Sequence, residues 1–475
     1  MRWARLGSVA VVLAAVGISL VPGARAAESA TVESDEALTD RLHQLVIDSP
    51  ALGRTAGVRV LLPTDFDDPA NADRRWPILW LLHGVGDDST TWTNNTDIEE
   101  LTADLPLVVA MPEAGKSPEA GWYSDWVDGP AWETFHLREL LPLIESRYHA
   151  GGARERRVVA GLSMGGFGTM SYAARHPDYF LGAASFSGAV DTVIAGPVTS
   201  TTFALLHPYA GTPDDRVWGP YETSEITWRG HNPTDLASNL RPLALWVRTG
   251  NGVPQLDDPP NPASQALETG IYTMNTSFHQ RLTGLGIEHA WFDRGYGLHT
   301  WRYWQEDLHT VLPELVALLA DPPPRPERFD YRFVEDTADV WGWAFEITDR
   351  SGAAFTELVS VGDDGLTVWG AGTLTATTPT GYAGSWRVQA AGVDDVVAAG
   401  DDGRLTFTVP LDVSPVEISL TPVSTKPEAP TVQPDGQGRL PATGRDPVAP
   451  AAIVVGALVA GLLLRRVDRR ASTSS

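Results

Sequence analysis

The sequence predicts an α/β fold with a mostly parallel central sheet, followed by a small all-β domain. Between residues 58 and 319, apolar runs typical of buried strands alternate with longer helix-like segments. Strands that alternate with helices form parallel sheets covered on both faces. After residue 329 the runs are short and alternating and are separated by Gly and Asp, which is typical of an antiparallel sandwich.

Each element of the first region is predicted from its own run of residues. Apolar runs bounded by turn residues predict strands, and longer runs with mixed polar and apolar residues predict helices. The residues before Val58 are expected to form a polar leader. The predicted strands are Val58–Pro63, Trp76–Leu82, Leu107–Met111, Arg157–Ala160, Ala183–Phe186, Leu243–Thr249 and His289–Phe292; the predicted helical segments are Trp132–Tyr148, Ser171–Arg175, Ala263–Thr283 and Trp301–Leu319.

The second region starts after a proline run, Pro322–Pro326, that ends the last helix and is expected to form a stiff linker. We expect an immunoglobulin-like sandwich there, since alternating runs recur. Its aromatic residues are consistent either with a glycan-binding face or with core packing, and core packing explains most of them. The runs are Asp339–Phe345, Leu366–Trp369, Ser385–Val388 and Leu405–Val409.

Length, charge and composition limit the functional classes. The 475 residues, 43% of them hydrophobic, exceed one average domain and can bury at least one large core. A formal net charge of −25 argues against a nucleic acid partner. The chain has no cysteine, so disulfides and thiol chemistry are excluded. It also has no H-E-x-x-H motif or clustered His/Asp ligand pattern, so we expect no metal and no cofactor.

The N-terminus is typical of a secretory signal peptide. Arg2 and Arg5 precede the apolar run Val9–Val21, and the small-x-small sequence Ala24–Ala26 follows. The apolar run is too short for a membrane span and a cleavage site follows it. We therefore expect export and a mature protein that starts near Ala27.

The C-terminus carries a second targeting pattern. The pentapeptide LPATG, Leu440–Gly444, is followed by the apolar run Ala451–Leu464 and by four arginines. This order resembles the sorting signal of Gram-positive surface proteins, in which sortase cleaves between Thr443 and Gly444 and joins the new end to peptidoglycan. The resemblance implies covalent anchoring to the cell wall. The alternative for the apolar run is a permanent single-span anchor, for which it is short.

The motif G-x-S-x-G at Gly161–Gly165 indicates a nucleophile. It follows the apolar run Val158–Ala160 and precedes a helix-like segment. In the α/β-hydrolase fold this strand-to-helix turn presents a serine hydroxyl, here that of Ser163, and needs glycine on both sides because helix and strand pass closely. The alternative is an ordinary Gly-rich turn, unless a base and an acid follow.

The base and the acid should follow Ser163 in the order acid, then histidine. Among seven downstream histidines we select His299, because it lies in a loop between the last predicted strand and the last predicted helix, where this fold places its base. For the acid, Asp257 and Asp258 closely follow a strand and Glu268 lies on a helix. Spacing alone does not choose among them.

Several segments resemble the antigen 85 mycolyltransferases and the related esterase D group, over roughly residues 58–319. In that family the acid is a glutamate after a Gly-Asn-Gly motif, so the resemblance implies a Ser163, Glu268 and His299 triad. The segments are Trp132–Phe135, Gly161–Gly166, Trp218–Pro220, Trp246–Pro254 and Leu298–Trp304.

The same chemistry requires two backbone N–H groups for the oxyanion, one after the nucleophile and one in the loop after an early strand. These are expected at Met164 and Val85. On the substrate side the chain departs from antigen 85, which holds trehalose through an aspartate and an arginine where this chain has His83 and Gly86. We expect His83 and Trp301 to contact substrate.

These expectations combine into a domain plan. It comprises a signal peptide (1–26), an α/β-hydrolase domain (27–321), a β-sandwich (327–423), a Pro-rich linker (424–439) and a sorting region (440–475). The leading hypothesis is a wall-anchored serine esterase or acyltransferase acting on acyl lipids or acylated sugars. The alternatives are a mycolyltransferase acting on trehalose or arabinogalactan, and a non-catalytic adhesion or glycan-binding protein on a hydrolase scaffold.

Overall fold

The computed structural model describes residues 29–194, 214–350, 352 and 354–423. The predicted signal peptide, Pro-rich linker and sorting region, including Thr443 and Gly444, lie outside these residues. Within the described ranges, no helix is long and apolar enough to span a membrane. The α/β and all-β regions together form one compact unit that ends at Val423.

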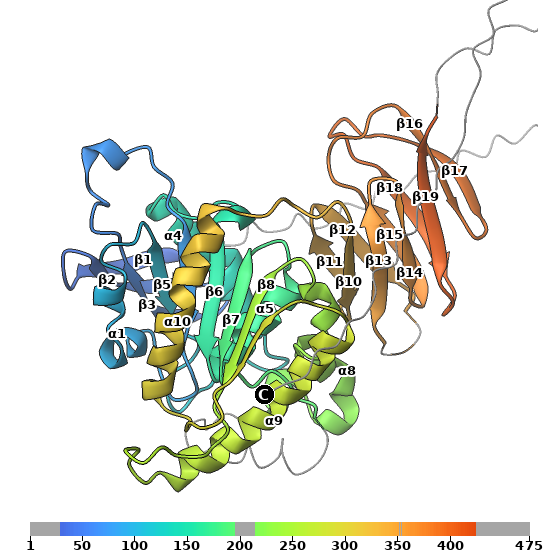
Figure 1. Ribbon diagram of the computed structural model, residues 1–475. Coiled ribbons are helices and arrows are strands. Elements are labelled where there is room, and N and C mark those ends of the chain that lie inside the picture. The colour runs from blue at the N-terminus through green and yellow to red at the C-terminus, as the bar shows by residue number, and fades with distance from the viewer. Residues whose placement is uncertain (1–28, 195–213, 351, 353, 424–475) are drawn as a thin grey trace, which may run out of the picture. The chain divides into compact units, whose positions relative to one another are not determined.

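The first region is built on a nine-stranded sheet in the order β1-β2-β3-β5-β4-β6-β7-β8-β9 (Figure 1). The first three pairs in this order, β1–β2, β2–β3 and β3–β5, are antiparallel. The remaining five pairs, from β5–β4 to β8–β9, are parallel. This agrees with the predicted mostly parallel sheet. The strands are β1 (Thr31–Ala37), β2 (Leu42–Ser49), β3 (Arg54–Leu61), β4 (Ile78–Leu82), β5 (Val108–Pro112), β6 (Arg157–Leu162), β7 (Gly182–Phe186), β8 (Ala244–Thr249) and β9 (Ala290–Asp293).

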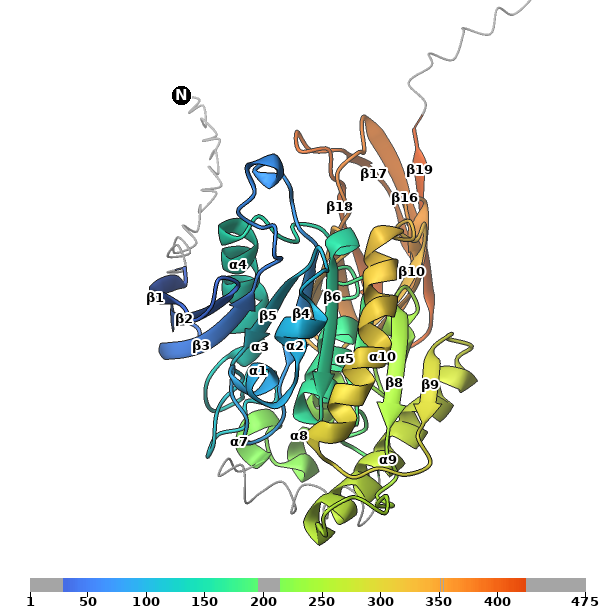
Figure 2. The same cartoon turned by 60° about the vertical axis from the view of Figure 1, so that its left-hand side comes forward.

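Helices cover both faces of this sheet, which explains why its central strands are continuously apolar. In β4, Leu79 and Leu81 join the core under α10, whereas Ile78 and Trp80 join the core under α4, α5 and α9. Figure 2 shows α10 lying across its face of the strands. The helices are α1 (Thr91–Asn95), α2 (Ile98–Leu101), α3 (Trp132–Thr134), α4 (Leu141–Arg147), α5 (Met164–Arg175), α7 (Asp214–Trp218), α8 (Tyr221–His231), α9 (Pro262–Gly284) and α10 (Trp301–Ala320).

Two sequence-based predictions in this region are wrong. The residues before Val58 form strands β1 and β2 rather than a leader; β1 is exposed at the sheet edge and therefore carries polar residues without an apolar pattern. Helix α5 begins at Met164, seven residues earlier than predicted. Its first turns contain Gly165, Gly166 and Gly168, which disfavour a helix by propensity but are required by close contacts with neighbouring elements.

The second region consists of two antiparallel sheets, β10-β13-β14-β19-β16-β17 and β11-β12-β15-β18. The predicted run Asp339–Phe345 is two strands, because the chain turns at Trp341 and Gly342, both of which have positive φ. The strands are β10 (Phe329–Phe333), β11 (Thr337–Val340), β12 (Trp343–Thr348), β13 (Thr356–Gly362), β14 (Gly365–Trp369), β15 (Gly372–Thr377), β16 (Ser385–Ala390), β17 (Val393–Ala398), β18 (Thr406–Leu411) and β19 (Val416–Pro422).

Both sheets contribute side chains to a single apolar core. Most aromatic side chains of the region, including Trp341, Trp343 and Phe345, are buried in it. Core packing therefore accounts for them without a glycan-binding face.

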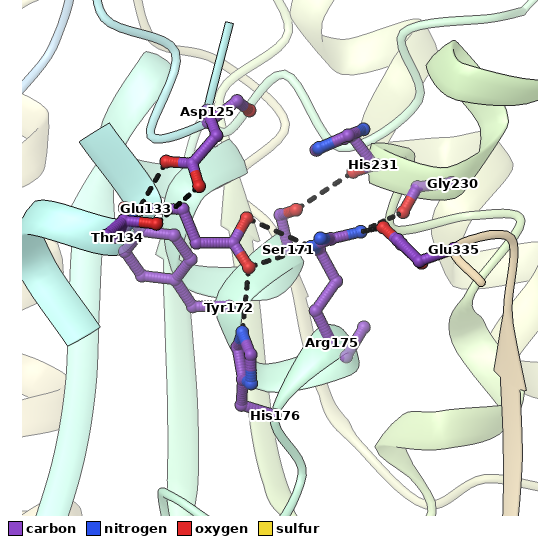
Figure 3. Close-up of polar contacts among 12 residues, drawn as sticks. Asp125, Glu133, Thr134, Ser171, Tyr172, Arg175, His176, Gly230, His231 and Glu335 are labelled. Atoms are coloured by element: carbon purple, nitrogen blue, oxygen red, sulfur yellow. Dashed lines mark hydrogen bonds and ion pairs between the residues drawn. The ribbon is translucent and has the colours of Figure 1, made fainter. Parts of the chain in front are cut away.

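A partly buried charge cluster joins the two regions at the C-terminal end of α5 (Figure 3). The Arg175 Nε donates to both carboxylate oxygens of Glu133, at 3.1 and 3.0 Å, and its Nη1 donates to Glu335 from the all-β region. The Tyr331 hydroxyl donates to the Arg175 carbonyl at 2.7 Å, which satisfies a carbonyl at the helix end. Burial alone would raise the pKa of Glu133, but Arg175 and His176 hold it well below its usual range.

A second contact has the pattern of strand pairing. The Asn239 amide oxygen accepts from Arg332 N–H, and its Nδ2 donates to the Arg332 carbonyl, both at 2.8 Å. Asn239 is fully buried. Residues of β10 are thus bonded to the hydrolase region through a side chain and not through another strand.

We predict that Arg175→Met destabilises the protein by about 3–5 kcal/mol, because Glu133 would then remain buried without its cation. Arg387→Met is the matched control: it breaks the exposed pair with Asp394, at 3.0 Å, and should cost about 1 kcal/mol or less. Urea unfolding of the three proteins measures both changes. Equal stabilities for the two variants would contradict the structural importance of the cluster.

Candidate active site

Ser163 lies at the sharp turn between β6 and α5, with φ 53° and ψ −118°. This strained conformation is typical of a nucleophile elbow. The flanking glycines are required here: a Cβ on Gly161 would lie 2.4 Å from the Gly165 carbonyl oxygen, and one on Gly165 would lie 2.4 Å from the Leu82 carbonyl oxygen. The motif is therefore a strand-to-helix elbow and not a generic Gly-rich turn.

The structure brings Ser163, His299 and Glu268 together in one hydrogen-bonded chain. The Ser163 Oγ lies 2.8 Å from His299 Nε2, and the His299 Nδ1 lies 2.6 Å from Glu268 Oε2. A proton on Nδ1 that is donated to the carboxylate leaves Nε2 free to accept from the serine hydroxyl. This is the arrangement in which a histidine can remove a serine proton.

Glu268 is fully buried, and its second oxygen is bound by three further groups. Its Oε1 accepts from the Gly250 N–H at 2.7 Å, the Ser187 hydroxyl at 2.8 Å and the Thr249 hydroxyl at 3.4 Å. Gly250 has to be glycine, since a Cβ there would lie 2.9 Å from Oε1 and 2.8 Å from the Gly297 carbonyl oxygen. This contact explains physically why the first position of the Gly-Asn-Gly motif is a glycine.

The two aspartates that spacing could not exclude lie elsewhere. Asp257 pairs with Arg302 at 3.0 Å, and Asp258 accepts from the Tyr303 hydroxyl and from Arg302. Neither is bonded to His299. The carboxylate that bonds His299 is that of Glu268 on α9, which is the residue that the family resemblance implies.

Two further contacts fix His299, one to its imidazole ring and one to its backbone carbonyl. Its ring meets the Trp304 ring edge-on, with centroids 4.9 Å apart, and its carbonyl accepts from the Ser264 hydroxyl at 3.0 Å. Both neighbours come from the first turns of long helices, Ser264 on α9 and Trp304 on α10.

A cavity of about 390 Å³ opens at Ser163, within the size range of small-molecule sites. Its walls come from the loop after β4 and from the first turns of α9 and α10. Trp301, which the sequence analysis expects to contact substrate, is one of the residues that line it. The lining residues are Gly84, Val85, Gly86, Asp87, Leu162, Ser163, Asn261, Ala263, Ser264, Leu267, His299, Thr300, Trp301 and Trp304.

The two N–H groups predicted for the oxyanion lie at this end of the sheet. Met164 is the first residue of α5, where N–H groups have no acceptor within the helix, and Val85 lines the cavity. Gly84 is held in the same loop by a hydrogen bond from its N–H to Asp87 Oδ2, at 3.3 Å.

The prediction that His83 contacts substrate is contradicted. His83 is 1% exposed and does not line the cavity. Its Nδ1 bonds the Gly84 carbonyl and its Nε2 accepts from the Ala114 N–H, both at 2.8 Å. Burial lowers its pKa to about 4. His83 is a neutral core residue that joins the loop after β4 to the end of β5.

Sequence reasoning missed several residues of the site. Ser187 directly follows β7, and Asp87 lies in the loop after β4; both occupy the carboxyl ends of strands, where sites of such sheets form. Trp304 and Gly250 lie inside segments that the resemblance had already selected. No group of side chains in the described residues could hold a metal ion.

Comparison with known proteins now gives the family. The sequence model of the esterase family, described as "Putative esterase", matches residues 49–315. The chain belongs to this esterase family. Diacylglycerol acyltransferase/mycolyltransferase Ag85A of Mycobacterium leprae is 30% identical over 297 residues, which are 59% of this chain and 84% of that protein.

One further relative matches over a smaller share of its length, and one solved structure over almost all of its length. Esterase Rv1288 of Mycobacterium tuberculosis is 34% identical over 258 residues, 52% of this chain and 54% of its own, so the match spans about half of that relative. The crystal structure of Mycobacterium tuberculosis MPT51 (FbpC1) aligns with 21% identity and a TM-score of 0.49, covering 60% of this chain and 99% of that one. The family model is thus that of an esterase, and these curated relatives are named as an esterase and an acyltransferase/mycolyltransferase.

We predict that Glu268→Gln lowers kcat on short p-nitrophenyl esters by about 10³- to 10⁴-fold, because the amide no longer stabilises the imidazolium of His299. Asp257→Asn is the matched control and should change kcat by less than about twofold, since its carboxylate is exposed and pairs only with Arg302 in the described contacts. Steady-state kinetics of the purified variants tests both. Similar losses in the two variants would mean that Glu268 is not the acid.

Proposed function

We propose that the protein is an exported, wall-anchored serine esterase or acyltransferase that works through an acyl-enzyme on Ser163. The Ser163 oxygen attacks the ester carbonyl while His299 Nε2 takes its proton. The carbonyl π electrons move to the oxygen, and their return expels the alcohol, which receives the proton from His299. Water or a sugar hydroxyl then repeats the sequence and releases the acyl group.

The observation that carries this proposal is the hydrogen-bonded chain from Ser163 through His299 to Glu268 at a strained elbow. A carboxylate as completely bonded as that of Glu268 can fix the imidazole and compensate its positive charge when it forms. The N–H groups of Val85 and Met164 are the proposed donors to the oxyanion. One such donor contributes about 3 kcal/mol of transition-state stabilisation.

Acyl transfer to a sugar is the second candidate, supported by the similarity to an Ag85A protein that is named as a diacylglycerol acyltransferase/mycolyltransferase. Trehalose and arabinogalactan are the candidate acceptors. Against them, His83 and Gly86 occupy the two positions that the resemblance associates with trehalose, and His83 is buried. The ratio of transfer to hydrolysis, measured with an acyl donor and added trehalose, separates the two candidates.

The expected location rests on the sequence at both ends of the chain. The signal peptide-like segment 1–26 and the LPATG pentapeptide support export and joining of Thr443 to peptidoglycan by sortase. We predict that Thr443→Ala moves the protein from the wall fraction to the membrane or medium fractions of the native host, because the cleavage site is lost. Immunoblotting of the fractions measures this. An unchanged wall fraction, released only by muramidase, would contradict sorting at this site.

We predict that Ser163→Ala lowers kcat/KM on p-nitrophenyl esters by several orders of magnitude, since the nucleophile is lost. Hydrolysis of p-nitrophenyl esters of increasing acyl chain length, by a protein that comprises residues 27–443, measures which acyl groups the cavity of about 390 Å³ accommodates. If Ser163→Ala and the wild type are equally inert on all esters, the result favours the non-catalytic adhesion hypothesis over the esterase and the mycolyltransferase hypotheses.

A further inference from the structure

One ionisable side chain of the cavity has no part in the proposed catalytic steps. Among the described residues that line the cavity, Asp87 and His299 are the two with an acidic or basic side chain. Asp87 lies in the loop after β4 that also carries Val85. It is not one of the two positions that the resemblance associates with sugar binding, which are His83 and Gly86.

The carboxyl of Asp87 lies close to the nucleophile. Gly84 lies next to both residues. A Cβ placed on Gly84 would lie 3.3 Å from Asp87 Oδ2 and also 3.3 Å from Ser163 Cβ, so both atoms lie within 3.3 Å of the same point. Oδ2 accepts from the Gly84 N–H at 3.3 Å, which fixes the carboxyl at the cavity wall. A substrate ester at Ser163 would therefore place its neighbouring atoms against this carboxyl.

Among the described residues that line the cavity there is no lysine or arginine that would neutralise a charged Asp87, and His299 is the one basic side chain. Asp88 follows in the same loop, and the hydroxyl of Tyr123, which donates to the His83 carbonyl at 3.0 Å, is close enough to Asp87 to interact with it electrostatically. His299 lines the same cavity. Burial raises the pKa of Asp87 to about 7, with a further increase from Asp88, against a decrease from the Gly84 hydrogen bond. The carboxyl is thus mostly neutral at pH 5.5 and mostly charged at pH 8.5.

We propose that Asp87 is a specificity-determining residue that selects esters by charge. It rejects substrates with an anionic group near the ester and accepts neutral or cationic substrates, whose hydroxyl or ammonium groups can donate to it. Rejection strengthens as Asp87 ionises, because two like charges a few ångströms apart in a half-buried site repel strongly. The inference rests on the proposed function, since it concerns the substrate of the Ser163 site.

The test uses two esters of equal acyl length, neutral p-nitrophenyl valerate and anionic mono-p-nitrophenyl glutarate. We expect the kcat/KM ratio of glutarate to valerate for the wild type to fall at least tenfold from pH 5.5 to pH 8.5. Taking the ratio on one enzyme cancels every pH effect that is common to the two substrates. In Asp87→Asn, which can keep the hydrogen bond from Gly84, the ratio should stay within about twofold.

Two further variants keep the test decisive. Asp88→Asn changes the neighbouring charge outside the cavity lining and should retain a fall like that of the wild type. Asp87→Ser should behave as Asp87→Asn does, if the amide impairs folding. A wild-type ratio that does not change with pH, or one that falls equally in Asp87→Asn, would overturn the inference while leaving valerate hydrolysis intact. Absence of valerate hydrolysis would instead overturn the proposed function, and the inference with it.

Stability gives an independent readout. A carboxyl with a raised pKa in the folded state binds its proton more tightly there, so its contribution to stability is lost as pH rises from about 4 to about 7. The Tm of Asp87→Asn minus the Tm of the wild type should therefore be larger at pH 8.5 than at pH 4.5. A constant Tm difference across this range would contradict the buried, titrating carboxyl.

Discussion

The fully buried carboxylate of Glu268 is the interaction on which the site depends. It binds Gly250 at the end of β8, Ser187 after β7 and His299 before α10, and it is itself carried by α9. Four elements that are distant in the sequence thus meet at two oxygen atoms. An uncompensated carboxylate at this position would be costly, so the donors that satisfy it also fix the sheet edge, the helix and the imidazole in one geometry.

The two ends of α5 are held by different means. At its start, the elbow fixes Ser163 through glycines that permit close approach of α5, β6 and β4. At its end, Arg175 is bonded to Glu133 and Glu335, and its carbonyl is bonded by Tyr331 of the all-β region. The all-β region therefore completes the environment of the helix that follows Ser163.

The strongest local patterns predicted the fold well, and tertiary contacts explain the failures. The central strands were recognisable because both of their faces are buried, whereas the exposed edge strand β1 has no such pattern. Ser163 and His299 followed from a motif and from chain order. Choosing Glu268 required a resemblance, because what selects it is the set of donors from Gly250 and Ser187. His83 was misjudged because its burial and its two backbone bonds are invisible in sequence.

The most direct measurement of the central claim is labelling with a fluorophosphonate followed by peptide mass mapping. Such probes react with a serine only when its hydroxyl is activated by a base. The structure predicts a single adduct on the peptide that contains Ser163, formed rapidly in the wild type and far more slowly in Glu268→Gln. An active wild-type enzyme whose adduct maps to another serine, or whose labelling rate is unchanged in Glu268→Gln, would contradict it.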